Sequence, residues 1–156
     1  MAKFKYRLQK VVEIRERKVK QQEQKVIEAR LQVQEVEQRV AQKKHEIYSA
    51  QEHMKTAAHT LMEFHDRFIH RCHQELEELA IEKQEKEAYL LEQSKLLVRY
   101  QADVEALVKH KEKALEEWKE EQKRAEMKIL DEVASQRYFR SQQEAEDEYV
   151  AESADW

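Results

Sequence analysis

The chain has 156 residues, contains no glycine and no proline, and is 40% Asp, Glu, Lys or Arg. Without glycine it lacks the phosphate-cradling loops and nucleophile elbows of many enzymes, and without proline it lacks the strongest helix breaker. No stretch approaches the roughly 18 consecutive apolar residues that a membrane span requires, the mean hydropathy of -1.02 argues against a globular core, and the formal net charge of -4 argues against a binder of nucleic acid. We therefore expect an almost entirely helical protein that is not an enzyme.

A heptad pattern from Leu8 to Phe68 predicts a long first helix that packs against a second helix. All nine a positions of this register are apolar: Val12, Val19, Val26, Val33, Val40, Ile47, Met54, Leu61 and Phe68. The nine d positions, of which six are apolar, are Leu8, Arg15, Gln22, Ala29, Val36, Lys43, Ala50, Ala57 and Phe64. A strict three-four spacing of this length is typical of a left-handed coiled coil.

A second apolar stripe, broader and closer to a period of 3.6, runs from Leu76 to Val133. We predict an all-α protein, a long antiparallel two-helix coiled-coil hairpin, as one domain over residues 1–140. Helix one spans about 3–68, the bend about 69–75 and helix two about 76–140. The predicted bend has no glycine or proline, so a parallel dimer of long helices stays open as the alternative to this monomer.

The two ends of the chain carry opposite charge. Only Glu13 and Glu16 offset eight cations in the first twenty residues: Lys3, Lys5, Arg7, Lys10, Arg15, Arg17, Lys18 and Lys20. Residues 141–156 contain six carboxylates and no cation, which predicts an acidic tail that is frayed or disordered. Because a hairpin would bring its ends together, we expect this tail to shield the basic start.

The predicted bend has the most suggestive cluster of possible metal ligands. The cluster consists of His65, Asp66, His70, Cys72 and His73. Its spacing matches no recurrent zinc pattern, so we expect a polar cap that holds no metal and no cofactor. The single cysteine excludes an intramolecular disulfide and fits a reducing compartment, and its exposure would permit crosslinking between two copies.

Basic residues alternate with Phe4 and Tyr6 at the start of the chain. This pattern leaves open a binder of nucleic acid or of an anionic membrane surface, although the acidic overall balance favours a protein partner.

Two blocks, FKYRLQKVVEIRERK and WKEEQKRAEMKILDEVASQRY, resemble the FliJ family of the bacterial flagellar type III export apparatus. The matching features are Phe4, Tyr6, Leu8, Val11, Val12 and Arg15, then Trp118, then Leu130, Asp131, Glu132, Ala134 and Arg137. The resemblance implies a non-enzymatic hairpin similar to the central stalk of rotary ATPases, cytoplasmic and peripheral at the inner membrane. An injectisome stalk protein of the same design is the alternative.

The resemblance also implies three kinds of partner: the hexameric export ATPase FliI, the export gate protein FlhA and substrate chaperones. The ATPase would contact the terminal end of the hairpin, through Phe4, Tyr6, Arg7, Lys10, Arg15, Leu130, Asp131, Glu132 and Arg137. The gate would contact the bend, through Phe64, Phe68 and Cys72.

Overall fold

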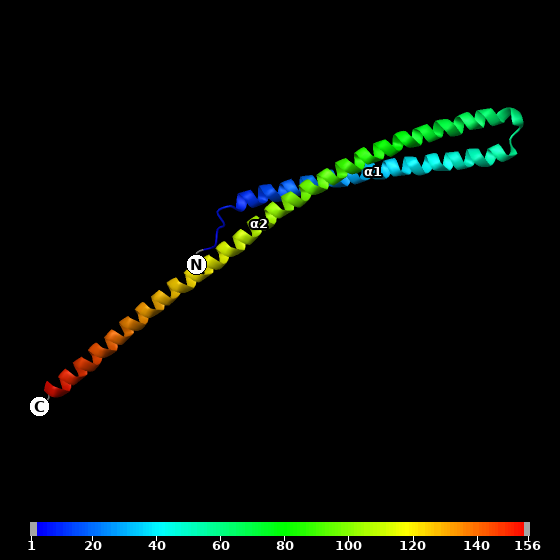
Figure 1. Ribbon diagram of the computed structural model, residues 1–156. Coiled ribbons are helices and arrows are strands. Elements are labelled where there is room, and N and C mark those ends of the chain that lie inside the picture. The colour runs from blue at the N-terminus through cyan, green and yellow to red at the C-terminus, as the bar shows by residue number, and fades with distance from the viewer. Residues whose placement is uncertain (1–2, 155–156) are drawn as a thin grey trace. The chain divides into compact units, whose positions relative to one another are not determined.

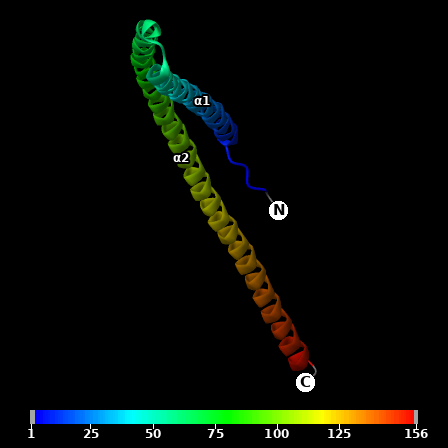
Figure 2. The same cartoon turned by 90° about the vertical axis from the view of Figure 1, so that its right-hand side faces the viewer.

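The computed structural model describes residues 3–154 and contains two helices, α1 (Gln9–Thr56, 48 residues) and α2 (His59–Ala154, 96 residues). Figures 1 and 2, two perpendicular views, show α1 lying antiparallel along the first part of α2. The described residues contain no strand. The predicted all-α helical hairpin is therefore confirmed.

The contacts of the chain divide into two units, which are described in turn. The hairpin unit is Lys10–Ala106, and the terminal unit combines Met1–Gln9 with Leu107–Trp156. The extent of a single domain over residues 1–140 stays a prediction.

The core of the hairpin unit is the predicted seam of α1. Its most buried members include Ala29 and Val36, each only 1% exposed, along with Val12, Val26, Val33, Ile47 and Ala50. Small residues such as Ala29 allow the two helices to approach closely, and the β-branched residues fill the space between them. Burial of this column stabilises the pair, because each fully buried valine contributes roughly 1.5 to 3 kcal/mol.

The facing column of α2 is more regular than its apolar residues indicate. Buried or half-buried positions alternate by four and three residues without a break: Ile69, Cys72, Leu76, Leu79, Lys83, Lys86, Leu90, Gln93, Leu97, Tyr100, Val104, Leu107, Lys111, Ala114 and Trp118. Our prediction of a looser period was wrong, because four of these positions are polar. Long polar side chains keep their alkyl stems in such a seam while their ends reach its edge.

Every polar member of the two columns bonds across the helix pair within its own unit. In the hairpin unit the contacts run from Arg15 with Asp103, through Gln22 with Gln93, Lys86 with Gln32 and Lys83 with Glu37, to Lys43 with Glu75. In the terminal unit Lys111 Nζ donates to Gln9 Oε1 at 2.8 Å. A sliding of one helix against the other would separate all of these pairs, so they fix the register.

The bend lies at Ala57 and Ala58, not at residues 69–75. The predicted end of helix one, at residue 68, was therefore wrong by about twelve residues. The predicted start of helix two, at residue 76, was wrong by about seventeen residues. At the end of α1, Thr56 Oγ1 bonds to the carbonyl of His53 at 3.3 Å and so competes with the continuing helix. Two small alanines then make the turn, and the described residues include none with positive φ.

The seam of α1 stops where the helix stops. Leu61 is 52% exposed and Phe64 is 68% exposed, although both continue the heptad spacing in the sequence. They belong to the first turns of α2, where a different face of the helix meets α1. The predicted register therefore holds as far as Ala57 and fails beyond it.

In the terminal unit, residues 3–8 are not helical, and residues 7 and 8 form a turn that leads into α1, whereas the sequence predicts helix from residue 3. Phe4, Tyr6 and Leu8 are half-buried, while Lys3, Lys5 and Arg7 are exposed. A helix would place Lys5 at the next a position of the seam. In the observed non-helical segment, burial instead alternates from residue to residue, so the two aromatic rings are half-buried and the three charged side chains stay in water.

Residues 123–154 of α2, here called the C-terminal extension, are helical and exposed throughout. The prediction of a frayed or disordered tail is wrong for residues 141–154, and residues 155 and 156 lie outside the described chain. No helix of the described chain combines the length and the apolar character that crossing a membrane requires.

Candidate partner-binding surfaces

Two ring contacts hold the N-terminal segment, residues 3–8, on α2. The rings of Phe4 and Trp118 lie 5.9 Å apart between centroids, with an interplanar angle of 54°. The Tyr6 hydroxyl and His110 Nδ1 are 2.7 Å apart, and their rings are tilted against each other at 5.8 Å. Tilted aromatic pairs of this kind contribute roughly 0.5 to 1.5 kcal/mol beyond their burial. The segment therefore presents Lys3, Lys5 and Arg7 outward from an anchored backbone.

Of the other two basic candidates, Lys10 is exposed and Arg15 is engaged within the hairpin unit. Arg15 pairs with Asp103 at 3.1 Å, and both side chains remain about half exposed. Arg15 thus has a structural role that Arg7 and Lys10 lack among the contacts described.

The remaining candidates for the ATPase contact lie on the C-terminal extension. Leu130 is 66% exposed, and Asp131, Glu132 and Arg137 are exposed beside it. At 1.5 Å per residue, Leu130 lies about 18 Å along α2 from Trp118, where Phe4 is anchored. The structure therefore does not bring these residues against the N-terminal segment.

The predicted shielding of the basic start by the acidic tail is also wrong. Glu144 begins the acidic run and lies about 39 Å along the helix from Trp118. Exposed charges at such a separation are screened, because the Debye length is about 8 to 10 Å at physiological salt.

The candidates for the gate contact differ in accessibility. Phe64 is exposed, Phe68 is half-buried, and Cys72 is only 1% exposed. Cys72 is thus part of the seam, and the expected crosslinking through an exposed thiol is wrong for this conformation. Within the described residues, no group of three or more His, Cys, Asp or Glu side chains is arranged to hold a metal ion.

Phe64 and Phe68 contribute to a groove of about 510 Å³ between the two arms, here called the bend groove. Ala50, Phe64 and Phe68 form its apolar part, and His45, His53, His65 and Arg71 provide its main polar groups. The sequence prediction missed His45 and His53, because a bend at 69–75 would place them far from Phe64. The sequence offered no conventional signal for a bend after Thr56, because alanine is a strong helix former and the chain has no glycine or proline.

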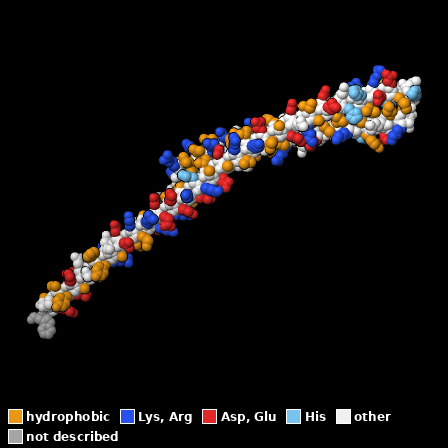
Figure 3. Space-filling model, in the orientation of Figure 1, with side chains coloured by type: hydrophobic (Ala, Val, Ile, Leu, Met, Phe, Trp, Pro, Cys, Tyr) orange, Lys and Arg blue, Asp and Glu red, His pale blue; other side chains and the backbone are white. Residues whose placement is uncertain are grey.

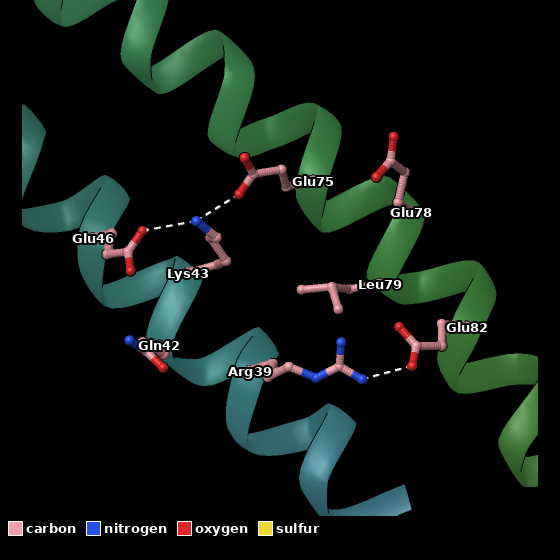
Figure 4. Close-up of a pocket in the computed structure, with 8 residues that line it drawn as sticks. All are labelled: Arg39, Gln42, Lys43, Glu46, Glu75, Glu78, Leu79 and Glu82. Carbon is pink, nitrogen blue, oxygen red and sulfur yellow. Dashed lines mark hydrogen bonds and ion pairs between the residues drawn. The ribbon is translucent and has the colours of Figure 1, made fainter. Parts of the chain in front are cut away.

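A second cavity, of about 390 Å³, lies between the arms and is lined by charged side chains (Figure 4). Arg39 pairs with Glu82 at 2.6 Å, and Lys43 bridges Glu46 at 3.0 Å and Glu75 at 2.5 Å. The hydrogen bond from Lys43 lowers the pKa of Glu75, while the same contact raises the pKa of Lys43. The hydrogen bond to Glu82 likewise raises the pKa of Arg39. These groups remain charged at neutral pH and join the arms.

The Glu75 ion pair predicts an acid-dependent part of the stability. A carboxylate with a lowered pKa stabilises the fold above its ordinary value of 4.5, and this stabilisation is lost as the pH falls through the folded pKa. Glu75→Gln should therefore lower the urea midpoint at about pH 7 but leave it unchanged at about pH 2. Glu78→Gln is the matched control, since Glu78 lines the same cavity without an ion pair in Figure 4. An equal loss at both pH values would contradict the assignment.

Comparison with known proteins identifies one family. The family model described as flagellar FliJ protein matches residues 4–143, which include the N-terminal segment from Phe4 onward, all of α1 and most of α2. No curated protein and no solved structure matched the chain. Because the family model covers nearly the whole chain, the protein belongs to the flagellar FliJ family.

Proposed function

We propose that this member of the FliJ family, a component of the flagellar export apparatus, is a non-enzymatic coupling protein between the export ATPase and the membrane export gate. The observation that carries the proposal is the family match over residues 4–143, which spans both sets of candidate contact residues. The chain would act in the cytoplasm, at the inner face of the inner membrane, through protein partners.

In this proposal the ATPase FliI contacts the exposed cations of the N-terminal segment and the exposed Leu130 region. Phe4 and Tyr6 serve mainly to anchor the segment, since their rings pack against Trp118 and His110. The gate protein FlhA contacts the bend through Phe64 and Phe68, while Cys72 supports that surface from within the seam. Substrate chaperones are a further class of partner for the exposed apolar residues of the C-terminal extension.

The basic start provides the direct test of the ATPase contact. Arg7→Glu with Lys10→Glu should raise the protein concentration that half-maximally stimulates ATP hydrolysis by FliI about tenfold, because two attractive contacts become repulsive. Arg15→Glu belongs in a separate variant, since it also breaks the pair with Asp103. Adding Asp103→Arg would restore that pair with reversed polarity and isolate the effect on the partner.

Arg30→Glu with Lys44→Glu is the matched control, because both residues are exposed cations of α1 away from its start. This control should stimulate the ATPase as the unmodified chain does. Equal stimulation by all variants would reject the basic start as the ATPase contact, and an absence of stimulation by the unmodified chain would reject the coupling role.

A further inference from the structure

A further apolar stripe lies on the face of α2 opposite its seam, within the hairpin unit. Its positions follow the same three-four spacing as the seam, and we call them the outer stripe: Ile81, Gln84, Ala88, Leu91, Lys95, Val98 and Ala102. Ile81, Leu91 and Val98 are 59%, 57% and 64% exposed, and the other four residues are exposed as well. Figure 3 shows hydrophobic side chains at the surface of the hairpin unit among charged ones.

The outer stripe is sharply limited along the helix. The same spacing continues on either side of it with polar residues alone, which are Arg67, His70, Gln74 and Glu77 before it and Glu105, Lys109, Glu112 and Glu116 after it. Single apolar residues scattered over a surface are normal, whereas this group is confined to about six turns of one helical face. Because it repeats every 3.5 residues, it can meet a second helix along its whole length of about 32 Å.

The two halves of the outer stripe carry opposite charge. The charged residues within it or beside it, all of them exposed, are Glu85, Glu92, Lys95 and Arg99. The two carboxylates belong to the first half, and the two cations belong to the second. Within the described chain these four are not held in ion pairs, unlike the neighbouring Glu87, which pairs with Lys83. The stripe therefore has an acidic half and a basic half, both open to a partner.

This arrangement of charge is complementary to itself. Two outer stripes placed antiparallel about a two-fold axis at about residue 92 bring the acidic half of each onto the basic half of the other. Arg99 then faces Glu85 of the second copy, and Lys95 lies beside Glu92 of the second copy. Glu85 and Arg99 are two heptads apart, so they lie on the same side of the stripe, and this side meets itself across such an axis. A parallel pairing in register would instead place like charges together.

We propose that the outer stripe is the interface of a homodimer, in which the α2 helices of two copies pack antiparallel about a two-fold axis near Glu92. Leu91 of each copy would lie at the centre, and Ala88 would leave room for Val98 of the other. With three large apolar residues per copy, the contact belongs to the small, transient class, and its dissociation constant should be on the order of 100 μM. The inference goes beyond the proposed function, since residues 81–102 include none of the candidate contacts with the ATPase or the gate.

Sedimentation equilibrium of the full chain tests the dimer. Between about 10 μM and about 1 mM, the mean mass should rise from 18.9 kDa toward twice that value. Leu91→Glu with Val98→Glu should keep the chain monomeric throughout. Ile27→Glu with Leu31→Glu is the matched control, because these residues are 49% and 58% exposed on α1 outside the outer stripe, and it should dimerise as the unmodified chain does. Circular dichroism checks that both variants keep their helices.

An exchange of charges tests the antiparallel pairing. Glu85→Arg alone should raise the dissociation constant about tenfold, because two attractive pairs become repulsive, and Arg99→Glu alone should do the same. The two substitutions together restore both pairs with reversed polarity, so the dissociation constant should return to within about twofold of the original. A double variant that is as weak as the single variants would reject this pairing.

The position of the axis is tested by crosslinking on a Cys72→Ala background. Leu91→Cys should form a disulfide between two copies under mild oxidation, because both cysteines would lie close to the axis. Ala102→Cys should not, since its two copies would be about 30 Å apart along the helices. Efficient crosslinking through residue 102 would indicate parallel pairing and contradict the proposal.

A monomeric mass at every concentration would overturn the homodimer and would leave the outer stripe to a different partner. Unchanged dimerisation of the Leu91→Glu, Val98→Glu variant would place the interface elsewhere, and growth beyond a dimer would reject the closed two-fold contact. No export component is present in these assays, so their outcome is independent of the ATPase test.

Discussion

Replacing Val36 by aspartate is expected to lower the free energy of unfolding of the hairpin by about 3 kcal/mol or more. Val36 is 1% exposed at the centre of the α1 seam, so the change removes a buried side chain and places a carboxylate among apolar groups. Urea unfolding followed by circular dichroism measures the difference. The result would identify the a and d columns as the main source of stability.

Leu31→Asp is the matched control, because Leu31 is 58% exposed on the same helix. Its effect should stay within about 0.5 kcal/mol, as is usual for surface substitutions. Similar losses in the two variants would mean that helix propensity, and not the seam, determines the stability of the pair.

Deleting residues 123–156 is expected to abolish the stimulation of the export ATPase without changing the urea midpoint of the remaining hairpin. The deletion removes Leu130, Asp131, Glu132 and Arg137, and the described part of the deleted segment is exposed throughout. It therefore removes candidate contacts with a partner while the seam stays intact. Steady-state ATP hydrolysis with the cognate ATPase and urea unfolding of the truncated chain give the two readouts.

A shorter deletion of residues 144–156 is the control, since it removes the acidic end and keeps the four candidate residues. It should leave stimulation unchanged, because the acidic run lies too far from the N-terminal segment to shield it. Full stimulation by the longer deletion would exclude the C-terminal extension from the ATPase contact.

The sequence predicted the seam of α1 well because nearly all of its buried positions are apolar and strictly spaced. The partner column was obscured by Lys83, Lys86, Gln93 and Lys111, which are polar yet lie at seam positions. These residues bond to the facing arm or, for Lys111, to Gln9 at the start of α1. A periodicity measured on hydrophobicity alone cannot detect polar residues that occupy positions of the seam.

The position of the bend could not be predicted from the apolar pattern, because Leu61, Phe64 and Phe68 continue the α1 spacing by coincidence. Their burial depends on which helix faces them, which is a property of the folded pair. The same error extended the second seam to Ile129 and Val133, which are 60% and 40% exposed. Once α1 ends at Thr56, it is too short to cover that part of α2.

The candidate contact residues were predicted from family resemblance, and the structure separates them by their physical roles. Phe4 and Tyr6 anchor a segment, Arg15 joins the two arms, and Cys72 packs in the seam. Arg7, Lys10, Leu130 and Phe64 remain exposed and suited to contact a partner. Hydropathy could not distinguish the residues that contact the rest of the chain from those that remain exposed, because both groups contain charged and aromatic residues.

The intramolecular antiparallel register is the central claim, because it assembles the bend groove and joins the two arms. Pulsed electron paramagnetic resonance on a Cys72→Ala background, diluted with unlabelled chain, tests it most directly. Spin labels at residues 39 and 82 should lie within about 20 Å, since Arg39 and Glu82 form an ion pair across the arms. Labels at 39 and 103 should lie about 36 Å apart, because residue 103 faces residue 15. An intrachain separation of about 60 Å or more between residues 39 and 82 would indicate a continuous helix and would contradict the hairpin.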